Sequence, residues 1–162
     1  MLPRAFLFEI LILATVSLAH HAYADVMKPS RSTLKELSAK LTQPEQAGTG
    51  MAPGLTTYYA VGDGKRNELF SLIFKVPPNS RIEAHSHPDA RSCFVLQGTW
   101  YLGYGDKFEK SELKALPPGS HYTEPAGANH FAATRDSAAL VECTGVGPTG
   151  TKFANSSDDP SQ

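Results

Sequence analysis

Residues 79–98 read NSRIEAHSHPDARSCFVLQG, and residues 119–134 read GSHYTEPAGANHFAAT. Each stretch holds short runs typical of β-strands, bounded by proline or glycine turns. Residues two positions apart in a strand project from the same face, so His85 and His87 can direct both imidazoles at one point. His130 begins a later strand, just after a turn, and can supply a third imidazole. The two stretches therefore predict a β-structure that brings three histidines together.

Similar strand-like runs fill most of the chain. A short helix is expected from Thr33 to about Thr42, because Thr33 and Glu36 make a capping box at its start. No long helix is expected after it. Many short strands separated by turns predict an all-β fold, an antiparallel barrel or jelly roll. The predicted strands are 55–61, 68–76, 81–87, 93–97, 99–104, 121–124, 129–133 and 138–144, with a further short strand at 113–116.

Length and charge limit the function classes. The chain has 162 residues, and its 15 lysines and arginines against 16 aspartates and glutamates give a formal net charge of −1. This length supports one domain with a proper hydrophobic core. The balanced charge offers no argument for nucleic acid or an anionic membrane surface, so we expect no nucleic-acid partner.

The N-terminus is predicted to be a signal peptide. A short basic start is followed by an apolar run from Ala5 to Ala19, and Ala22-Tyr23-Ala24 is a small-x-small motif that places cleavage after Ala24. The run is shorter than the roughly 20 residues that a spanning helix needs, so no membrane span is expected after cleavage. The protein is thus expected to be periplasmic or secreted. The alternative is an uncleaved amphipathic helix.

The expected organisation has four parts: a signal peptide (1–24), an N-terminal helix and linker (25–54), a β-barrel domain (55–153) and a disordered tail (154–162). The tail is expected to be disordered because it has no apolar anchor. Cys93 and Cys143 would both reach an oxidising compartment. They either form a disulfide or remain two buried free thiols.

The two histidine-containing stretches resemble the two motifs of the cupin family. The first motif is G-x5-H-x-H-x3,4-E-x6-G, and residues 79–98 match its histidines and its closing glycine. The second is G-x5-P-x-G-x2-H-x3-N, and residues 119–134 match four of its five defining positions. The resemblance covers roughly residues 68–146. It implies a small β-barrel that holds a divalent metal, often in a homodimer, with three metal ligands: His85, His87 and His130.

The chain departs from these motifs at three positions. Asn79 replaces a glycine and Thr134 replaces an asparagine, and both replacements are tolerated in turns. Arg91 stands where the family places a glutamate ligand, and a guanidinium cannot coordinate a cation. The site would then have neutral ligands only, and the full dication charge favours anionic or chelating substrates. Arg91 either pairs with a substrate carboxylate or makes a structural salt bridge, for example to Asp89 or Glu83.

Other residues are candidates for roles in catalysis. Glu83 lies two residues before His85 and is expected to face the site, as a substitute fourth ligand or a general base. The alternative is a rim residue paired with Arg81. Tyr122 and Glu124 share a strand face and are expected to line the pocket, whereas His121 has the opposite parity and is expected at the surface or behind the ligands. Three strand aromatics are expected to pack in the barrel core: Phe94, Trp100 and Tyr101.

Three functions fit this pattern. The first is a metal-dependent enzyme of dioxygenase type, acting on a small anionic or chelating molecule. Three-histidine iron sites of this kind resemble those of thiol dioxygenases and diketone-cleaving cupins. The second is an isomerase, epimerase or lyase that uses zinc, manganese or nickel, with Glu83, Glu124 or Tyr122 moving protons. The third is a non-catalytic exported protein that binds a metal or a metabolite. Iron is the leading candidate for the ion.

Overall fold

The computed structural model describes residues 27–41 and 52–159, so the predicted signal peptide and residues 160–162 lie outside the described ranges. The chain divides into two units, Met1–Arg31 and Ser32–Gln162, and the second holds all the elements described below. Its helices are α2 (Leu34–Lys40) and two 3-10 helices, η1 (Lys110–Glu112) and η2 (Ser156–Asp158). Its strands are β1 (Thr56–Val61), β2 (Leu69–Val76), β3 (Arg81–Ser86), β4 (Arg91–Gln97), β5 (Trp100–Tyr104), β6 (Lys114–Leu116), β7 (His121–Glu124), β8 (His130–Ala133), β9 (Ala139–Val146) and β10 (Lys152–Phe153).

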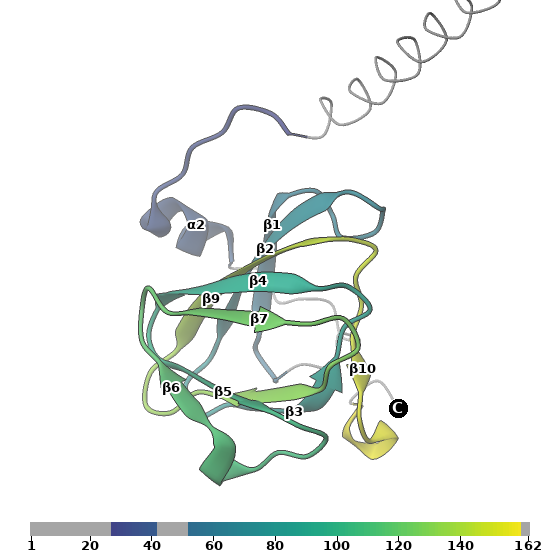
Figure 1. Ribbon diagram of the computed structural model, residues 1–162. Helices are drawn as coiled ribbons and strands as arrows, with labels where there is room; N and C mark the ends of the chain where they lie inside the picture. Colours follow the sequence, from purple (N-terminus) through teal and green to yellow (C-terminus); the bar gives the residue numbers. More distant parts are fainter. Residues whose placement is uncertain (1–26, 42–51, 160–162) are drawn as a thin grey trace, which may run out of the picture. The chain divides into compact units, whose positions relative to one another are not determined.

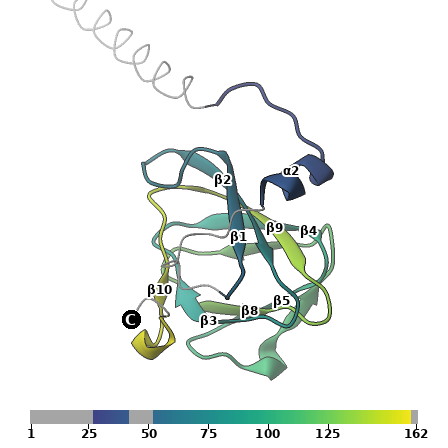
Figure 2. The ribbon, with the colours of Figure 1, turned by 180° about the vertical axis from the view of Figure 1, so that it is seen from behind.

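The strands form two antiparallel sheets of five strands each. One sheet has the order β1-β2-β9-β4-β7, and the other has the order β10-β3-β8-β5-β6. In Figure 1, β4 and β7 lie side by side above β5 and β3, and the view from behind shows β1 and β2 on the opposite side (Figure 2). The predicted all-β fold is confirmed. No helix in the two described ranges is long and apolar enough to cross a membrane.

The hydrophobic core lies between the sheets because the strands alternate inward and outward side chains. Along β4, Cys93 and Val95 are buried while Ser92 and Phe94 are exposed. The core also takes inward side chains from the other strands, among them Phe74, Val76, Ile82, Trp100, Leu102, Tyr122 and Val141.

The two cysteines form a disulfide inside this core. Cys93 of β4 and Cys143 of β9 are direct cross-strand partners, and both are fully buried. This pairing decides between the two alternatives that the sequence left open.

The short helix α2 covers part of the outer face of the first sheet. Its capping box is present, because the Thr33 side chain accepts from the Glu36 amide while the Glu36 carboxylate accepts from the Thr33 amide. Leu41, at its end, packs with Ile73 and Leu140. This contact explains why β2 and β9 have buried side chains on both faces.

Asn79 and Gly98, at the two ends of the first motif, have left-handed backbone conformations. Asn79 has φ 54°, so the asparagine holds the conformation for which the motif uses glycine. Gly98 has φ 73°, and a Cβ there would overlap with the carbonyl of Ala138. Thr134, at the end of the second motif, accepts from the Ser80 amide and donates to the Pro77 carbonyl, which ties the motifs together.

Three sequence-based expectations about the fold are wrong. Tyr101 is half-buried and lies outside the hydrophobic core, with the guanidinium of Arg135 over its ring. Phe94 is 48% exposed rather than in the core, because it points outward from β4, where its ring stacks near that of His121. Residues 154–159 are not a featureless tail. The Ala154 amide donates to the Ala84 carbonyl, and the Asn155 side chain caps η2. These hydrogen bonds hold residues 154–159 in place, although the segment has no large apolar side chain to pack against the domain.

Candidate metal centre

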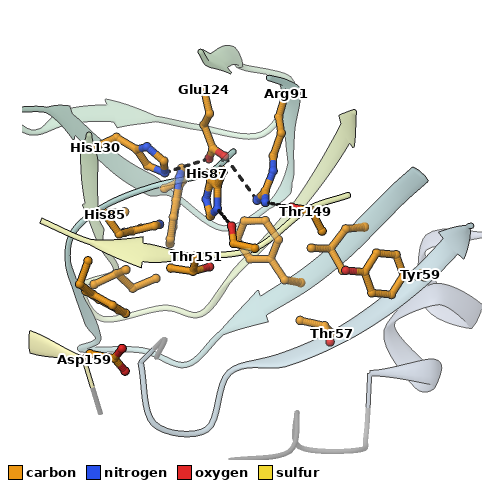
Figure 3. Close-up of a pocket in the computed structure, with 17 residues that line it drawn as sticks. Thr57, Tyr59, His85, His87, Arg91, Glu124, His130, Thr149, Thr151 and Asp159 are labelled. Carbon is orange, nitrogen blue, oxygen red and sulfur yellow. Dashed lines mark hydrogen bonds and ion pairs between the residues drawn. The ribbon is translucent and has the colours of Figure 1, made fainter. Parts of the chain in front are cut away.

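Three buried histidines meet between the two sheets. His85 of β3 and His130 of β8 are direct cross-strand partners, and His87 follows β3 by one residue. All three are buried, and their ligand nitrogens lie within 4.8 Å of one another. Figure 3 shows the three rings turned toward one another below Glu124. The structure thus brings together the three predicted ligands.

A β-bulge sets the direction of these side chains. Ile82 pairs with Ala132 and His85 pairs with His130, so β3 has one extra residue between the two pairs. The bulge turns Ile82 and His85 to the same inward face and Glu83 outward. There the Glu83 carboxylate pairs with Arg81, with 2.5 Å between Oε1 and the arginine Nε. The expectation that Glu83 faces the site is therefore wrong.

Backbone carbonyls orient each imidazole. The Nδ1 atom lies 2.7 Å from the Glu83 carbonyl in His85, and 2.6 Å from the Gly150 carbonyl in His87. In His130 it lies 3.3 Å from the Ala128 carbonyl. A carbonyl only accepts, so these contacts assign the ring proton to Nδ1. Each Nε2 is therefore left with its lone pair toward the centre, as metal-binding histidines require.

Burial also keeps the three imidazoles neutral. It lowers the pKa of His85 to about 4, with further lowering from His130. It lowers the pKa of His87 to about 2, where the Arg91 charge acts in the same direction. The pKa of His130 falls to about 4, again mainly through burial. A neutral imidazole is the form that binds a metal, so all three are ready ligands at neutral pH.

Glu124, the last residue of β7, places its carboxylate among the histidines. Its Oε1 lies 3.5 Å from Nε2 of His130, and its Oε2 lies 3.5 Å from Nε2 of His87. The side chain is buried, and Oε2 has no hydrogen-bond partner among the described residues. Burial raises the pKa of Glu124, while Arg91 acts in the opposite direction. The prediction that Glu124 lines the pocket is confirmed.

Arg91 is held beside this carboxylate by its neighbours. Its Nε donates to Asp89 Oδ2 at 2.8 Å, and one terminal nitrogen donates to the Thr149 hydroxyl. Its Nη1 lies 3.6 Å from Oε2 of Glu124. Both Arg91 and Asp89 are buried. Of the alternatives for Arg91, the structural salt bridge to Asp89 is present, and the side chain also borders the cavity.

The histidines, Glu124 and Arg91 border one cavity of about 270 Å³. Apolar side chains form much of the rest of its wall: Leu72, Phe74, Ile82, Trp100, Ala132 and Phe153. Trp100 is thus both a core residue and part of the wall. Tyr122 points inward but belongs to the core below the cavity, where its hydroxyl lies 3.8 Å from Cys143 Sγ. The expectation that it lines the pocket is wrong. His121 is exposed, as predicted, and contacts Ser92.

The C-terminal segment closes one side of this cavity, and sequence reasoning missed it. Thr149, Gly150 and Thr151 line the cavity, and so does Asp159 (Figure 3). Gly150 holds His87 through its carbonyl, and Thr149 holds Arg91. None of these residues lies in either motif, so a motif comparison gives no signal for them. Their contribution depends on β10 pairing with β3.

These donors fit a divalent metal ion. Three neutral imidazole nitrogens and one buried carboxylate are the ligand types that zinc, iron, manganese and nickel accept. The charges agree with this, because Arg91 is the one guanidinium beside two carboxylates, Asp89 and Glu124, so an ionised Glu124 leaves one negative charge in excess. Excess buried charge is costly, and a bound cation would relieve that cost.

Solved structures resemble this chain in fold. The polyketide cyclase RemF from Streptomyces resistomycificus matches 82% of this chain and 90% of its own, with 19% identity and a TM-score of 0.59. A cupin-superfamily sugar phosphate isomerase from Silicibacter pomeroyi matches 69% of this chain and 72% of its own, with 18% identity and a TM-score of 0.50. A salicylate 1,2-dioxygenase from Pseudoaminobacter salicylatoxidans matches 75% of this chain and 36% of its own, with 13% identity and a TM-score of 0.56.

No family model and no curated protein matches the sequence. These three structural matches are below 25% identity, so they establish architecture and leave the reaction open. They include a cyclase, an isomerase and a dioxygenase, which carry out unrelated reactions on one scaffold. Together with the two antiparallel sheets and the histidines gathered between them, they show that this chain has the fold of the cupin superfamily.

Proposed function

We propose that this protein is a metal-dependent enzyme of dioxygenase type that acts on a small anionic or chelating molecule. The observation that carries the proposal is the arrangement of the three histidines. Their Nδ1 atoms are engaged by backbone carbonyls, and their Nε2 atoms converge on the wall of a cavity. A divalent metal bound there would act as a Lewis acid and as a template for O2 and the substrate.

The size and lining of the cavity favour a small, partly apolar substrate. Its volume of about 270 Å³ and its aromatic wall, with Phe74, Trp100 and Phe153, suit a compact molecule with an apolar face. Two threonines in the cavity lining, Thr57 and Thr151, offer hydroxyls that can hydrogen-bond polar groups of the substrate (Figure 3).

Arg91 serves in this proposal as a positioning residue rather than as the main anchor of the substrate. Its guanidinium is already engaged by Asp89 and Thr149 and lies near Glu124. Attraction of an anionic or chelating group would therefore come chiefly from the bound ion. In a dioxygenation both atoms of O2 enter the substrate, which supplies all four electrons, so no further reductant is needed.

A second candidate is a metal-dependent isomerase or lyase, for which Glu124 would act as the proton-transferring group. The buried carboxylate beside two histidines favours it. The two candidates differ in their need for oxygen. An isomerase or lyase still converts its substrate under nitrogen, whereas a dioxygenase does not, because it has no O2 to consume.

Oxygen uptake by the iron-loaded protein tests the proposal. A panel of thiols, diketones and catechols is supplied, and uptake is compared for the wild type, His87→Ala and His121→Ala. We expect uptake with at least one compound, loss of uptake in His87→Ala and no change in His121→Ala, since His121 is exposed and outside the cavity. An iron-loaded protein that consumes no oxygen across the panel would argue against the dioxygenase.

We also propose that the protein is exported and works as a homodimer. The signal-like N-terminus supports export, and the buried disulfide would persist in an oxidising compartment. N-terminal sequencing of the protein from the extracytoplasmic fraction is expected to begin at Asp25. Light scattering coupled to gel filtration tests the dimer, and a monomeric mass would contradict it.

A further inference from the structure

We propose that Glu124 is the carboxylate ligand of the metal, supplied from β7 in place of the glutamate that the first motif lacks at position 91. This inference rests on the proposed metal site and extends it. It changes the ligand set from three imidazoles to three imidazoles and one carboxylate. Nothing in the two motifs indicates it, because position 124 is one of their unspecified positions.

The distances around Glu124 match those between ligands of one ion. Two ligand atoms that each lie about 2.1 Å from an ion, at a tetrahedral angle, are about 3.4 Å apart. The two carboxylate oxygens lie 3.5 Å from Nε2 of His130 and of His87, one oxygen to each ring. These separations are too long for hydrogen bonds of normal strength.

The lone pairs in these contacts also favour a bound cation. Because Nδ1 carries the proton in His87 and His130, each Nε2 presents a lone pair to a carboxylate oxygen. Two acceptors that face each other repel unless a proton or a metal ion lies between them. Oε2 of Glu124 has no hydrogen-bond donor among the residues of the described ranges, so the arrangement is explained by an ion that both groups bind.

Arg91 cannot replace that ion. Its Nη1 stays 3.6 Å from Oε2, and its other nitrogens are directed to Asp89 and Thr149. Asp89 already compensates its charge. Arg91 therefore positions the carboxylate from one side and leaves the face toward the histidines open.

The test is a titration with Co²⁺ alone, followed by visible absorption, which reports the number and type of ligands. The purified full chain is stripped with a chelator and compared with Glu124→Gln, Glu83→Gln and His87→Ala. Glu83→Gln is the matched control, since it makes the same change at a carboxylate that faces away from the cavity. Circular dichroism confirms that each variant is folded.

We expect Glu124→Gln to bind Co²⁺ about 10- to 100-fold more weakly than the wild type and with an altered spectrum. Glu83→Gln should behave as the wild type, and His87→Ala should lose the site. If Glu124→Gln does not fold, Glu124→Asp, which keeps the charge and shortens the reach, is expected to show the altered spectrum instead.

The outcomes separate this inference from the proposed function. If the wild type binds Co²⁺, His87→Ala does not, and Glu124→Gln has unchanged affinity and spectrum, Glu124 is no ligand and only this inference is overturned. A wild-type protein that does not bind Co²⁺ overturns both.

Discussion

Arg91 and Glu124 are direct partners across β4 and β7, with Nη1 of the arginine 3.6 Å from Oε2 of the glutamate. The position where the motif expects a carboxylate and the position where this chain has one therefore lie side by side on neighbouring strands. A carboxylate is thus still available beside the histidines, although its place in the sequence differs by 33 positions (124 − 91).

Removal of Arg91 should destabilise the fold. Arg91→Ala leaves the buried Asp89 without its partner, and breaking a buried pair from one side costs about 3–5 kcal/mol of the free energy of unfolding. Urea denaturation measures this loss. Arg66→Ala is the control, because Arg66 is exposed and its pairs with Asp63 and Glu68 should contribute at most about 1 kcal/mol. Equal, small effects of both substitutions would contradict the buried pair.

The metal-free protein should lose stability as the pH falls from 6.5 toward 4. Burial lowers the pKa of the three site histidines from 6.5 to about 4, 2 and 4, so in this window the unfolded chain binds protons that the folded chain does not. Each histidine then lowers the free energy of unfolding by up to about 1.4 kcal/mol per pH unit. Glu124 acts in the opposite direction, because its raised pKa lets the folded chain bind a proton that the unfolded chain does not. It contributes one proton, whereas the histidines contribute three, so the loss of stability dominates.

Urea denaturation of chelator-treated protein between pH 7 and pH 4.5 measures this slope. His130→Ala should make it shallower, while His121→Ala should leave it unchanged because His121 is exposed. A free energy of unfolding that stays constant over the window would mean that the histidines are not buried in neutral form.

Loss of the disulfide should reduce stability by about 4 kcal/mol, the loop-entropy value for two cysteines 50 positions apart. The comparison is between the oxidised wild type and the double variant Cys93→Ala/Cys143→Ala, both by urea denaturation. Reduced wild-type protein separates loss of the bond from loss of the sulfur atoms. A double variant as stable as the oxidised protein would contradict the prediction.

Gly98→Ala should be more destabilising than Gly119→Ala. Both glycines have positive φ, 73° and 85°, so both substitutions carry backbone strain of about 1 kcal/mol or more. At Gly98 the new Cβ would also meet the carbonyl of Ala138, whereas at Gly119 it meets nothing within 4 Å. The difference between the thermal unfolding midpoints of the two variants measures the cost of the steric contact at position 98. Similar midpoints would mean that the Gly98 turn can shift.

The sequence predicted the elements better than the directions of some side chains. In a regular strand, side chains two residues apart lie on the same face, so Glu83 was predicted to lie on the face of His85. That prediction is wrong because a bulge inserts a residue between Ile82 and His85. The same alternation succeeded for Glu124, because β7 pairs with β4 without a shift. Phe94 was misplaced because an aromatic side chain alone does not show which face of a strand it occupies.

The sequence by itself determined the all-β fold and the three histidines. Short strands between turns are a local pattern, and the spacing of His85, His87 and His130 within two motifs is read directly from the chain. The carboxylate of the site was decided only by the tertiary structure. Packing of the two sheets brings Glu124 of β7 against His87 and His130, and the C-terminal segment supplies Gly150 to orient His87. The contacts of His87 with Glu124 and with Gly150 join residues 37 (124 − 87) and 63 positions apart, and no local pattern encodes them.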